Sequence, residues 1–424
     1  MEYLRKKLNN GLTLYSYQNS DLHSVTMAVV FPVDPNVLNK TQSGIYHYLE
    51  HLFFRRLGDI PQAQLYCTLE CMGTTLRGVT YLEHICFYVT VLPKYCLQVF
   101  DILVKVFEEQ KWNTSDLREE RNVVVNQIQC DNYFDFYKIA DRKYYQGTSY
   151  SYPIKGNISN TRFWTKSLVE HYRKKVFDVG RSGFIIAGAF DEKCYCSIVR
   201  KLSSYHSYGV CDFVKSNPVR FNQRNSVQDC FFYRSNYDVT DILMSFDISS
   251  DLNLCEVEFL SCILGEGDGS VLSISLRENL ALTNEIYSSI VHSRNGNRLI
   301  IQCSATSENA KECIRQIFDV IHSFRKRIPE RAFLMSKTFL TENRIQLYDN
   351  SYDLMNFLKA RFLYPGYFET IEECINYYDK IDITRLSATA NKLFASNNLF
   401  VGIAHNGNIS QKAVKKMFRN FDRA

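Results

Sequence analysis

The sequence lacks a segment suited to crossing a membrane. Across its 424 residues, no uncharged apolar run approaches the roughly 20 residues that a membrane-spanning helix needs. The first residues, Met1 to Leu8, include no apolar stretch of the kind found in secretion signals. We therefore expect a cytoplasmic protein that does not bind a membrane.

A strong excess of one charge is also missing. The formal net charge is +5, and the basic runs, such as Arg325-Lys326-Arg327 and Lys415-Lys416, are short and have no interleaved aromatic residues. Nucleic-acid-binding surfaces combine larger basic patches with recognisable motifs. These runs are better explained as solvated helix faces, and we expect no nucleic-acid partner.

The 14 cysteines lack the spacing of a disulfide framework. In a chain of this size without a secretion signal, scattered cysteines indicate reduced thiols. Cys67 with Cys71, and Cys194 with Cys196, resemble halves of a zinc finger, but neither has a second pair at finger spacing. We therefore predict buried thiols at these four positions.

A compact group of metal-binding residue types is present in His47-Tyr48-Leu49-Glu50-His51. Side chains at positions i and i+4 of a helix lie on one face, so both imidazoles can reach one cation. Glu50, on the neighbouring face, can reach a water on that cation. The order H-x-x-E-H is the signature of the inverzincins, a class of zinc peptidases. The alternative is a chance meeting of two histidines and a glutamate.

The flanking residues favour the metal site. Gly44 and Gly58 bracket the motif, and apolar residues recur between them at helical spacing, which predicts an amphipathic helix. The run from Gly44 to Phe54 closely resembles the zinc helix of the pitrilysin and mitochondrial processing peptidase family. The resemblance implies a zinc metallopeptidase of the short, two-domain type.

The same resemblance implies a third ligand, as catalytic zinc sites usually have three from the protein. In this family it is a glutamate in a helix with the pattern E-R-x-x-x-x-x-E-I, and the matching stretch here begins at Glu120. Gln127 occupies the ligand position, and Glu120 lies two turns earlier on the same face, where a supporting carboxylate belongs. A neutral amide is a poorer zinc donor than a carboxylate. We therefore predict that His47, His51 and Gln127 bind Zn²⁺ weakly.

Bound zinc would fix the chemistry. Zinc lowers the pKa of its water and polarises the peptide carbonyl, while a nearby carboxylate takes the proton and delivers it to the leaving amine. Glu50 is the candidate base, and Glu120 is the supporting catalytic carboxylate. The alternative for Glu50 is an ordinary residue of the helix surface.

Strand and helix patterns together indicate an α+β protein. A strand over residues 8–18, with a turn at Asn10-Gly11, is expected to pair with a strand over residues 25–31. The patterns then predict helices at about 61–72, 94–110, 115–145 and 164–176, an extended stretch at 74–91, a strand at 183–188 and a helix at 192–202.

The second half repeats this order after a polar stretch. We predict a strand at 240–247, a helix at 254–264, an extended stretch at 286–306, helices that begin near residues 308, 329 and 383, and a final strand and helix from residue 400. The strands at Phe184 and Phe400 each precede a helix and lie about 216 residues apart, which indicates a tandem duplication. The predicted domains are residues 1–205 and 229–424, joined by a linker at 206–228. The family resemblance implies two homologous α/β-sandwich halves, each with an antiparallel sheet packed against helices.

Glu83 and His84 are candidates for substrate binding. They lie in the extended stretch, which by the resemblance borders a cleft where a substrate peptide adds as an extra strand. The sequence Tyr81-Leu-Glu-His84 echoes the zinc motif but has Thr80 in place of its first histidine. Since residues three apart on a strand face opposite sides, an ordinary strand is favoured over a second metal site.

A second candidate segment lies in the other half. Arg277 matches the arginine of the family pattern L-R-E-x-x-G-L-x-Y, whose Arg and Tyr bind the substrate backbone and carbonyl. Ala281 and Asn284 replace its Gly and Tyr.

Two functional hypotheses follow. The first is a zinc endopeptidase, or the metal-bearing subunit of one, that cuts peptides or precursor leaders in a closed cleft, with a homologous partner supplying the Arg and Tyr in a heterodimer, or with a second copy in a homodimer. The alternative is a noncatalytic family member that binds peptides or supports an active partner, which Gln127 and Asn284 favour. A purely structural scaffold would make the motif accidental.

Overall fold

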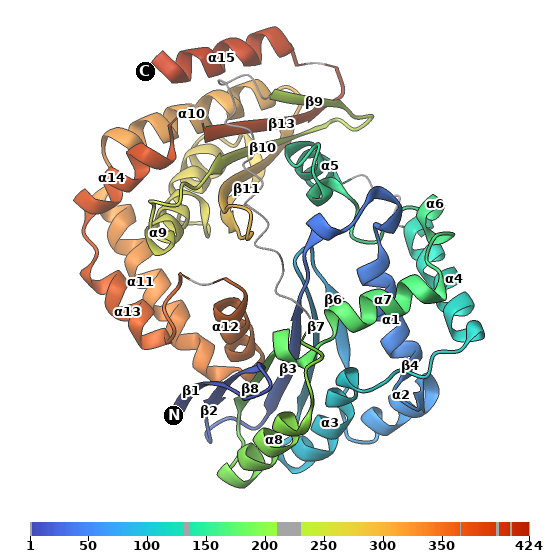
Figure 1. Ribbon diagram of the computed structural model, residues 1–424. Coiled ribbons are helices and arrows are strands. Elements are labelled where there is room, and N and C mark those ends of the chain that lie inside the picture. The colour runs from blue at the N-terminus through green and yellow to red at the C-terminus, as the bar shows by residue number, and fades with distance from the viewer. Residues whose placement is uncertain are drawn as a thin grey trace. The chain divides into compact units, whose positions relative to one another are not determined.

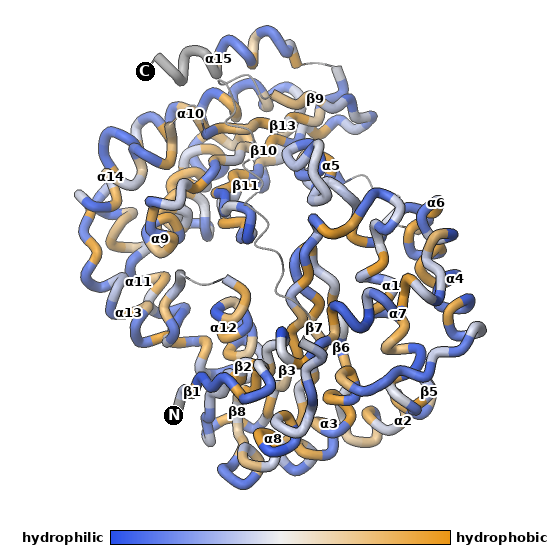
Figure 2. Tube along the Cα trace, in the orientation of Figure 1, coloured by the Kyte–Doolittle hydropathy of each residue, from blue (hydrophilic) through white to orange (hydrophobic). Residues whose placement is uncertain are grey.

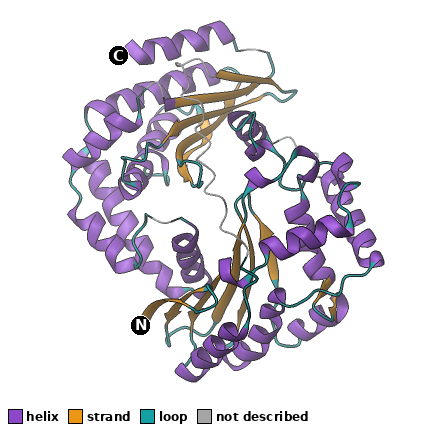
Figure 3. Ribbon diagram, in the orientation of Figure 1, coloured by secondary structure: helices purple, strands orange, loops and turns teal. Residues whose placement is uncertain are grey.

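The computed structural model describes residues 2–130, 135–209, 230–364, 366–395, 398–407 and 409–423. The chain divides into two units. Unit 1 comprises Met1–Phe134, Gly147–Ser216 and Gln346–Pro365, and unit 2 comprises Asp135–Gln146, Asn217–Ile345 and Gly366–Ala424. In each unit helices cover a sheet (Figures 1 and 3), which confirms the predicted α+β class.

The sheet of unit 1 has six strands in the order β1-β2-β8-β3-β7-β6. They are β1 (Glu2–Lys7), β2 (Thr13–Gln18), β3 (Val25–Pro32), β6 (Arg77–Thr80), β7 (His84–Val91) and β8 (Gly183–Gly188). β2 and β8 are parallel, and the other neighbours are antiparallel. The predicted pairing of residues 8–18 with residues 25–31 is wrong, because β8 returns from far along the chain and lies between β2 and β3.

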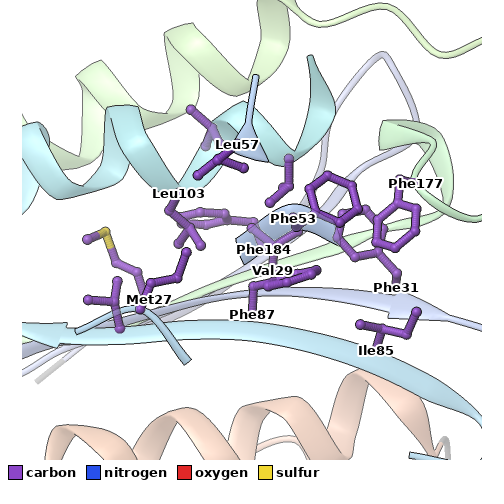
Figure 4. Close-up of a cluster of buried hydrophobic side chains, with 14 of the residues drawn as sticks. Met27, Val29, Phe31, Phe53, Leu57, Ile85, Phe87, Leu103, Phe177 and Phe184 are labelled. Carbon is purple, nitrogen blue, oxygen red and sulfur yellow. The ribbon is translucent and has the colours of Figure 1, made fainter. Parts of the chain in front are cut away.

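Helices pack on this sheet around an apolar core. They are α1 (Ile45–Arg55), α2 (Gln62–Glu70), α3 (Cys96–Leu103), α4 (Thr114–Cys130), α6 (Ile158–Thr161), α7 (Lys166–Val176), α8 (Glu192–Ser204) and α12 (Ser351–Leu363), with the short strands β4 (Arg56–Leu57) and β5 (Ile60–Pro61) beside them. Phe53 of α1 enters the core (Figure 4), where its ring centroid is 5.3 Å from that of Phe87 and 4.6 Å from that of Phe177. Burying a phenylalanine contributes about 2 kcal/mol. This packing fixes the orientation of α1.

The sheet of unit 2 repeats the topology of the first, which supports the predicted duplication. Its strands are β9 (Cys230–Arg234), β10 (Val239–Asp247), β11 (Thr283–Val291), β12 (Arg298–Thr306) and β13 (Leu399–His405). Their order, β11-β12-β10-β13-β9, matches β6-β7-β3-β8-β2, and the β9–β13 pair is parallel, as the β2–β8 pair is. The core strands of both sheets are largely apolar (Figure 2). The predicted stretch at 286–306 is a hairpin of β11 and β12.

The helices of unit 2 include five that the sequence predicts, among them the helix expected at 254–264 and the final helix. They are α5 (Phe136–Tyr144), α9 (Leu254–Gly265), α10 (Ala310–Lys326), α11 (Glu330–Gln346), α13 (Ile371–Lys380), α14 (Ile383–Leu393), α15 (Gln411–Arg423) and a π-helix at Ser273–Asn279. The helices expected near residues 308, 329 and 383 are confirmed as α10, α11 and α14, whereas α12 and α13 were not predicted. No helix among the described residues has the length and apolar character needed to cross a bilayer.

Each half of the sequence contributes one helix to the sheet of the other half. α12 packs on β3 and β8 of unit 1, and α5 packs on β10 and β13 of unit 2. The contacts are equivalent, because Phe362 of α12 covers Gly183 and Phe136 of α5 covers Gly402, at sites where a side chain on the glycine would meet the ring at 2.8 and 3.0 Å. The last strand of each sheet therefore uses a glycine to admit the exchanged helix.

Three further predictions concern the helix at 115–145, the linker at 206–228 and the cysteine pairs. The single helix predicted at 115–145 is wrong, since α4 ends at Cys130 and α5 begins at Phe136 in unit 2; residues 131–134 lie outside the described residues. Residues 210–228 of the predicted linker also lie outside them. Of the four cysteines predicted to be buried, Cys194 is buried, whereas the prediction is wrong for Cys67, Cys71 and Cys196, which are exposed.

Candidate functional site

Helix α1 presents the H-x-x-E-H residues on one side and its apolar residues to the core. It begins after Gly44, which has a φ of 91° and no room for a side chain, since a Cβ there would lie 2.6 Å from the Lys155 carbonyl oxygen and from the Trp164 ring. Only glycine tolerates both constraints. The buried residues on the helix include Ile45, Leu49, Leu52 and Phe53.

His47, His51 and Gln127 lie together. The two imidazole rings have centroids 4.6 Å apart. Gln127, from α4, places its Oε1 atom 3.1 Å from Nε2 of His47. α1 and α4 pack against each other (Figure 1), so side chains 80 positions apart in the sequence converge.

Glu120 orients His51. Its Oε1 atom is 2.8 Å from Nδ1 of His51, and its Oε2 atom accepts a 3.1 Å hydrogen bond from Nε of Arg55. The Glu120 side chain is only 5% exposed, and the arginine compensates its charge. Because Nδ1 is engaged, Nε2 of His51 is the nitrogen that would bind a metal, an arrangement common in metal sites.

Glu50 is held as a carboxylate. Its Oε2 atom accepts a 2.5 Å hydrogen bond from the Thr80 hydroxyl and lies 3.6 Å from Nδ1 of His47. Burial by itself would raise the pKa of Glu50, but the nearby His47 ring, the Thr80 hydrogen bond and the His51 ring outweigh it, so the pKa lies below its usual value. At neutral pH Glu50 is therefore ionised and able to accept a proton.

The spacing of one pair of these donors is compatible with zinc. Two ligand atoms on one tetrahedral zinc ion are separated by roughly 3.3 Å, close to the 3.1 Å between His47 and Gln127. Within the described part of the chain, no three His, Cys, Asp or Glu side chains form a metal-binding group, so a three-ligand site here depends on Gln127. As metal ligands all three would be neutral donors, and carboxylates nearby belong to Glu50 and Glu120.

An open strand edge and a cavity adjoin Glu50. β6, which ends at Thr80, is the outermost strand of its sheet. A small pocket lies beside Thr80, and its walls are mostly apolar side chains and backbone. The side chains that line it include Pro35, Leu38, Tyr46, Tyr81, Leu82, Tyr152 and Ile154. The arrangement suits an extended peptide, which pairs with free strand edges and places side chains in pockets.

The remaining candidate residues are more dispersed. Glu83 is buried and accepts a 2.7 Å hydrogen bond from the Tyr150 hydroxyl, and His84 is buried against the Tyr81 ring at 4.3 Å between centroids. Both belong to unit 1. They contribute to the interior behind β6 rather than to an open surface.

Arg277 and Asn284 belong to unit 2. Arg277, in the π-helix, is 43% exposed and pairs with Asp268 at 2.7 Å. Asn284 is exposed at a bulge of the edge strand β11. Between them Ala281 has a φ of 49°, the sole positive value for a non-glycine residue among those described, at the position where the family pattern has glycine.

Two contributors to the site were not predicted from the sequence. The sequence drew attention to Thr80 only because it stands where the repeated motif would have a histidine. Its hydrogen bond to Glu50 joins residues 30 positions apart, on a strand and on a helix. Arg55 lies four residues after His51 on the same helix face, so helical periodicity alone would have revealed it.

Two family models match the chain. The one described as Insulinase (Peptidase family M16) matches residues 15–137, and the one described as Peptidase M16 inactive domain matches residues 164–340. Together they cover more than half of the sequence. The chain belongs to the M16 peptidase family. Its membership confirms the family indicated by the H-x-x-E-H helix.

Relatives extend over different parts of this M16 chain. An "uncharacterized zinc protease" of Rickettsia felis is 23% identical over 398 residues, which cover 92% of this chain and 94% of that protein. The mitochondrial-processing peptidase subunit beta of Dictyostelium discoideum is 25% identical over 195 residues, 44% of this chain and 40% of that one. The crystal structure of a protease from Helicobacter pylori has a TM-score of 0.82 at 14% identity and covers 95% of this chain and 99% of that chain. This structural likeness shows a shared fold.

Proposed function

We propose that this chain is the metal-bearing subunit of an M16 zinc endopeptidase. The observation that supports it most strongly is the convergence of His47, His51 and Gln127 beside the carboxylate of Glu50. The name of the Rickettsia felis relative, a zinc protease, supports zinc as the ion. His47, His51 and Gln127 would hold it, and it would supply Lewis-acid polarisation of the peptide carbonyl.

The protein's own residues have distinct roles in this proposal. Glu50, ionised and held by Thr80, accepts the proton of the attacking water and passes it to the leaving amine. Glu120 keeps the His51 ring oriented and its tautomer fixed. Glu120 therefore acts through His51.

The proposed substrate is a peptide bound in extended form. Main-chain hydrogen bonds to the free edge of β6 would align it beside Glu50. Arg277 remains a proposed contact to the substrate backbone. Asn284, which replaces a tyrosine of the family pattern, leaves that contact to a homologous partner subunit or to a second copy of this chain. One relative is named as subunit beta of a peptidase, which supports the proposal of a second subunit.

A noncatalytic role is the second candidate function. Two replacements favour it: Gln127 offers the metal no charge, and Asn284 cannot replace a phenol. In this case the chain would bind peptides or support an active partner without cleaving anything itself.

Peptide hydrolysis by the full chain, loaded with zinc and mixed with its homologous partner, distinguishes the two. We expect cleavage that falls at least 100-fold in Glu50→Gln, as general bases contribute about that much or more, with zinc content unchanged. Glu70→Gln, an exposed residue on α2, is the matched control and should cleave normally. A complex whose activity is the same with Glu50→Gln as with the native chain would establish the noncatalytic role.

A further inference from the structure

Two sulfur atoms of unit 1 touch although their residues are 98 positions apart. The Sγ atoms of Cys96 and Cys194 are 3.4 Å from each other, and Cys96 also contacts the Met27 sulfur at 3.9 Å. Both cysteines are free thiols, 3% and 9% exposed respectively. The pair is separate from the candidate zinc site.

The backbone holds the two cysteines at adjoining helix ends. Cys96 is the first residue of α3, and Cys194 lies in the first turn of α8, where its N–H donates a 2.7 Å hydrogen bond to Asp191. α3 and α8 pack side by side (Figure 1). A disulfide requires the sulfurs to approach by only about 1.4 Å from their present separation.

The two thiols are chemically unequal. The sulfur–sulfur contact with Cys96 lowers the pKa of Cys194 and outweighs the opposing effects of burial and Asp191. The same contact, together with burial, raises the pKa of Cys96. Cys194, which is also the more exposed of the two, is therefore the nucleophile, and Cys96 is the thiol that closes the disulfide.

We propose that Cys96 and Cys194 form an oxidation site for hydrogen peroxide, at which the two thiols close into an intramolecular disulfide. The Cys194 thiolate attacks one peroxide oxygen, the O–O bond breaks, and Cys194 becomes a sulfenic acid while hydroxide leaves and is protonated. The Cys96 sulfur then attacks the Cys194 sulfur, and the second oxygen leaves as water. Two thiols lose two electrons, and one peroxide becomes two waters.

The disulfide would tie α3 to α8 and enclose the whole segment between them. That segment includes α4 with Glu120 and Gln127. A cross-link across about 100 residues stabilises a fold mainly by restricting the unfolded chain, which for a unit of this size corresponds to a rise in Tm of roughly 10 °C. This inference does not depend on the proposed peptidase activity.

Peptide mapping tests it on the intact protein. The reduced full chain is treated with hydrogen peroxide, its remaining thiols are alkylated, and a non-reducing digest is analysed by mass spectrometry. We expect a linked Cys96–Cys194 peptide, a higher Tm, and reversal of both by dithiothreitol. Cys96→Ser and Cys194→Ser should abolish the peptide and the Tm rise, and the exposed Cys67→Ser should preserve both.

A second thiol pair requires its own control. Cys303 and Cys313 of unit 2 each shift the pKa of the other, so the Tm shift is measured in a Cys303→Ser, Cys313→Ser background as well. The proposal is overturned if Cys96 and Cys194 are still fully alkylated under conditions that oxidise Cys67. This measurement uses the native chain, so it remains valid even if a variant fails to fold. A linked peptide with an unchanged Tm would overturn the stabilising role.

Discussion

The Thr80 hydroxyl donates a 2.5 Å hydrogen bond to Glu50, so the edge strand β6 is joined directly to the carboxylate on helix α1. The strand on which a peptide would pair is thus in contact with the group that would accept the proton. Any displacement of β6 by a bound peptide is transmitted to Glu50.

Replacing Thr80 with valine keeps the shape of the side chain and removes the donor. Because a hydrogen bond to a charged group contributes about 1.5–3 kcal/mol, we expect kcat for peptide hydrolysis to fall roughly 10-fold or more with little change in KM. The control is Thr338→Val in unit 2, where the hydroxyl donates to the Leu334 carbonyl of its own helix. Equal kcat values for the two variants would show that Glu50 does not need this bond.

Gln127→Glu should strengthen zinc binding. The change gives the candidate site one anionic ligand at a position whose oxygen already lies 3.1 Å from His47. We expect at least about a 10-fold gain in zinc affinity, since carboxylate is the better donor, measured by competition with a chelator. Gln129→Glu adds the same charge to an exposed position of the same helix and should change nothing. Native protein that keeps a full equivalent of zinc as firmly as Gln127→Glu would contradict the predicted weakness.

Glu120→Gln should affect both stability and metal binding. The buried carboxylate bonds His51 and Arg55, so its loss leaves the guanidinium without its principal partner and costs about 2 kcal/mol of unfolding free energy. Supporting groups of this kind change metal affinity about 10- to 100-fold. Glu119→Gln removes a neighbouring carboxylate that is 48% exposed and should cost under about 0.5 kcal/mol. Urea unfolding and zinc titration of both variants check this, and similar losses in the two would refute it.

Ala281→Gly should stabilise unit 2. Ala281 has a φ of 49°, in the left-handed region that disfavours a Cβ atom, so glycine is expected to add about 1 kcal/mol. The opposite sign is expected for Ala360→Gly within α12, where glycine costs about 0.5–1 kcal/mol. Chemical denaturation decides the matter, and a destabilised Ala281→Gly protein would show that the local backbone is not strained.

The sequence predicted which candidate site residues share a face when those residues belong to a single helix. His47, Glu50 and His51 follow from helical spacing, and so does the common face of Glu120 and Gln127. The family resemblance then related the two helices. The ordering of the strands, by contrast, escaped prediction, because β8 inserts between β2 and β3 from 150 or more positions away, and no local pattern records that pairing.

Other contacts between distant parts of the chain were not predicted for the same reason. The bond between Thr80 and Glu50 and the contact between Cys96 and Cys194 join residues whose local sequences contain no sign of each other. The local sequences of α5 and α12 do not reveal the sheet on which each helix packs.

The exchange of α5 and α12 makes the two halves of the polypeptide dependent on each other, because each half supplies a helix that covers the sheet of the other. Cleavage of the chain between α5 and α12 would remove one covering helix from each sheet and expose Gly183 in one fragment and Gly402 in the other. Each fragment would also contain a helix without the sheet on which it packs. Neither fragment should therefore become soluble when produced separately. Co-expression of both pieces is the condition under which a native-like protein would reassemble.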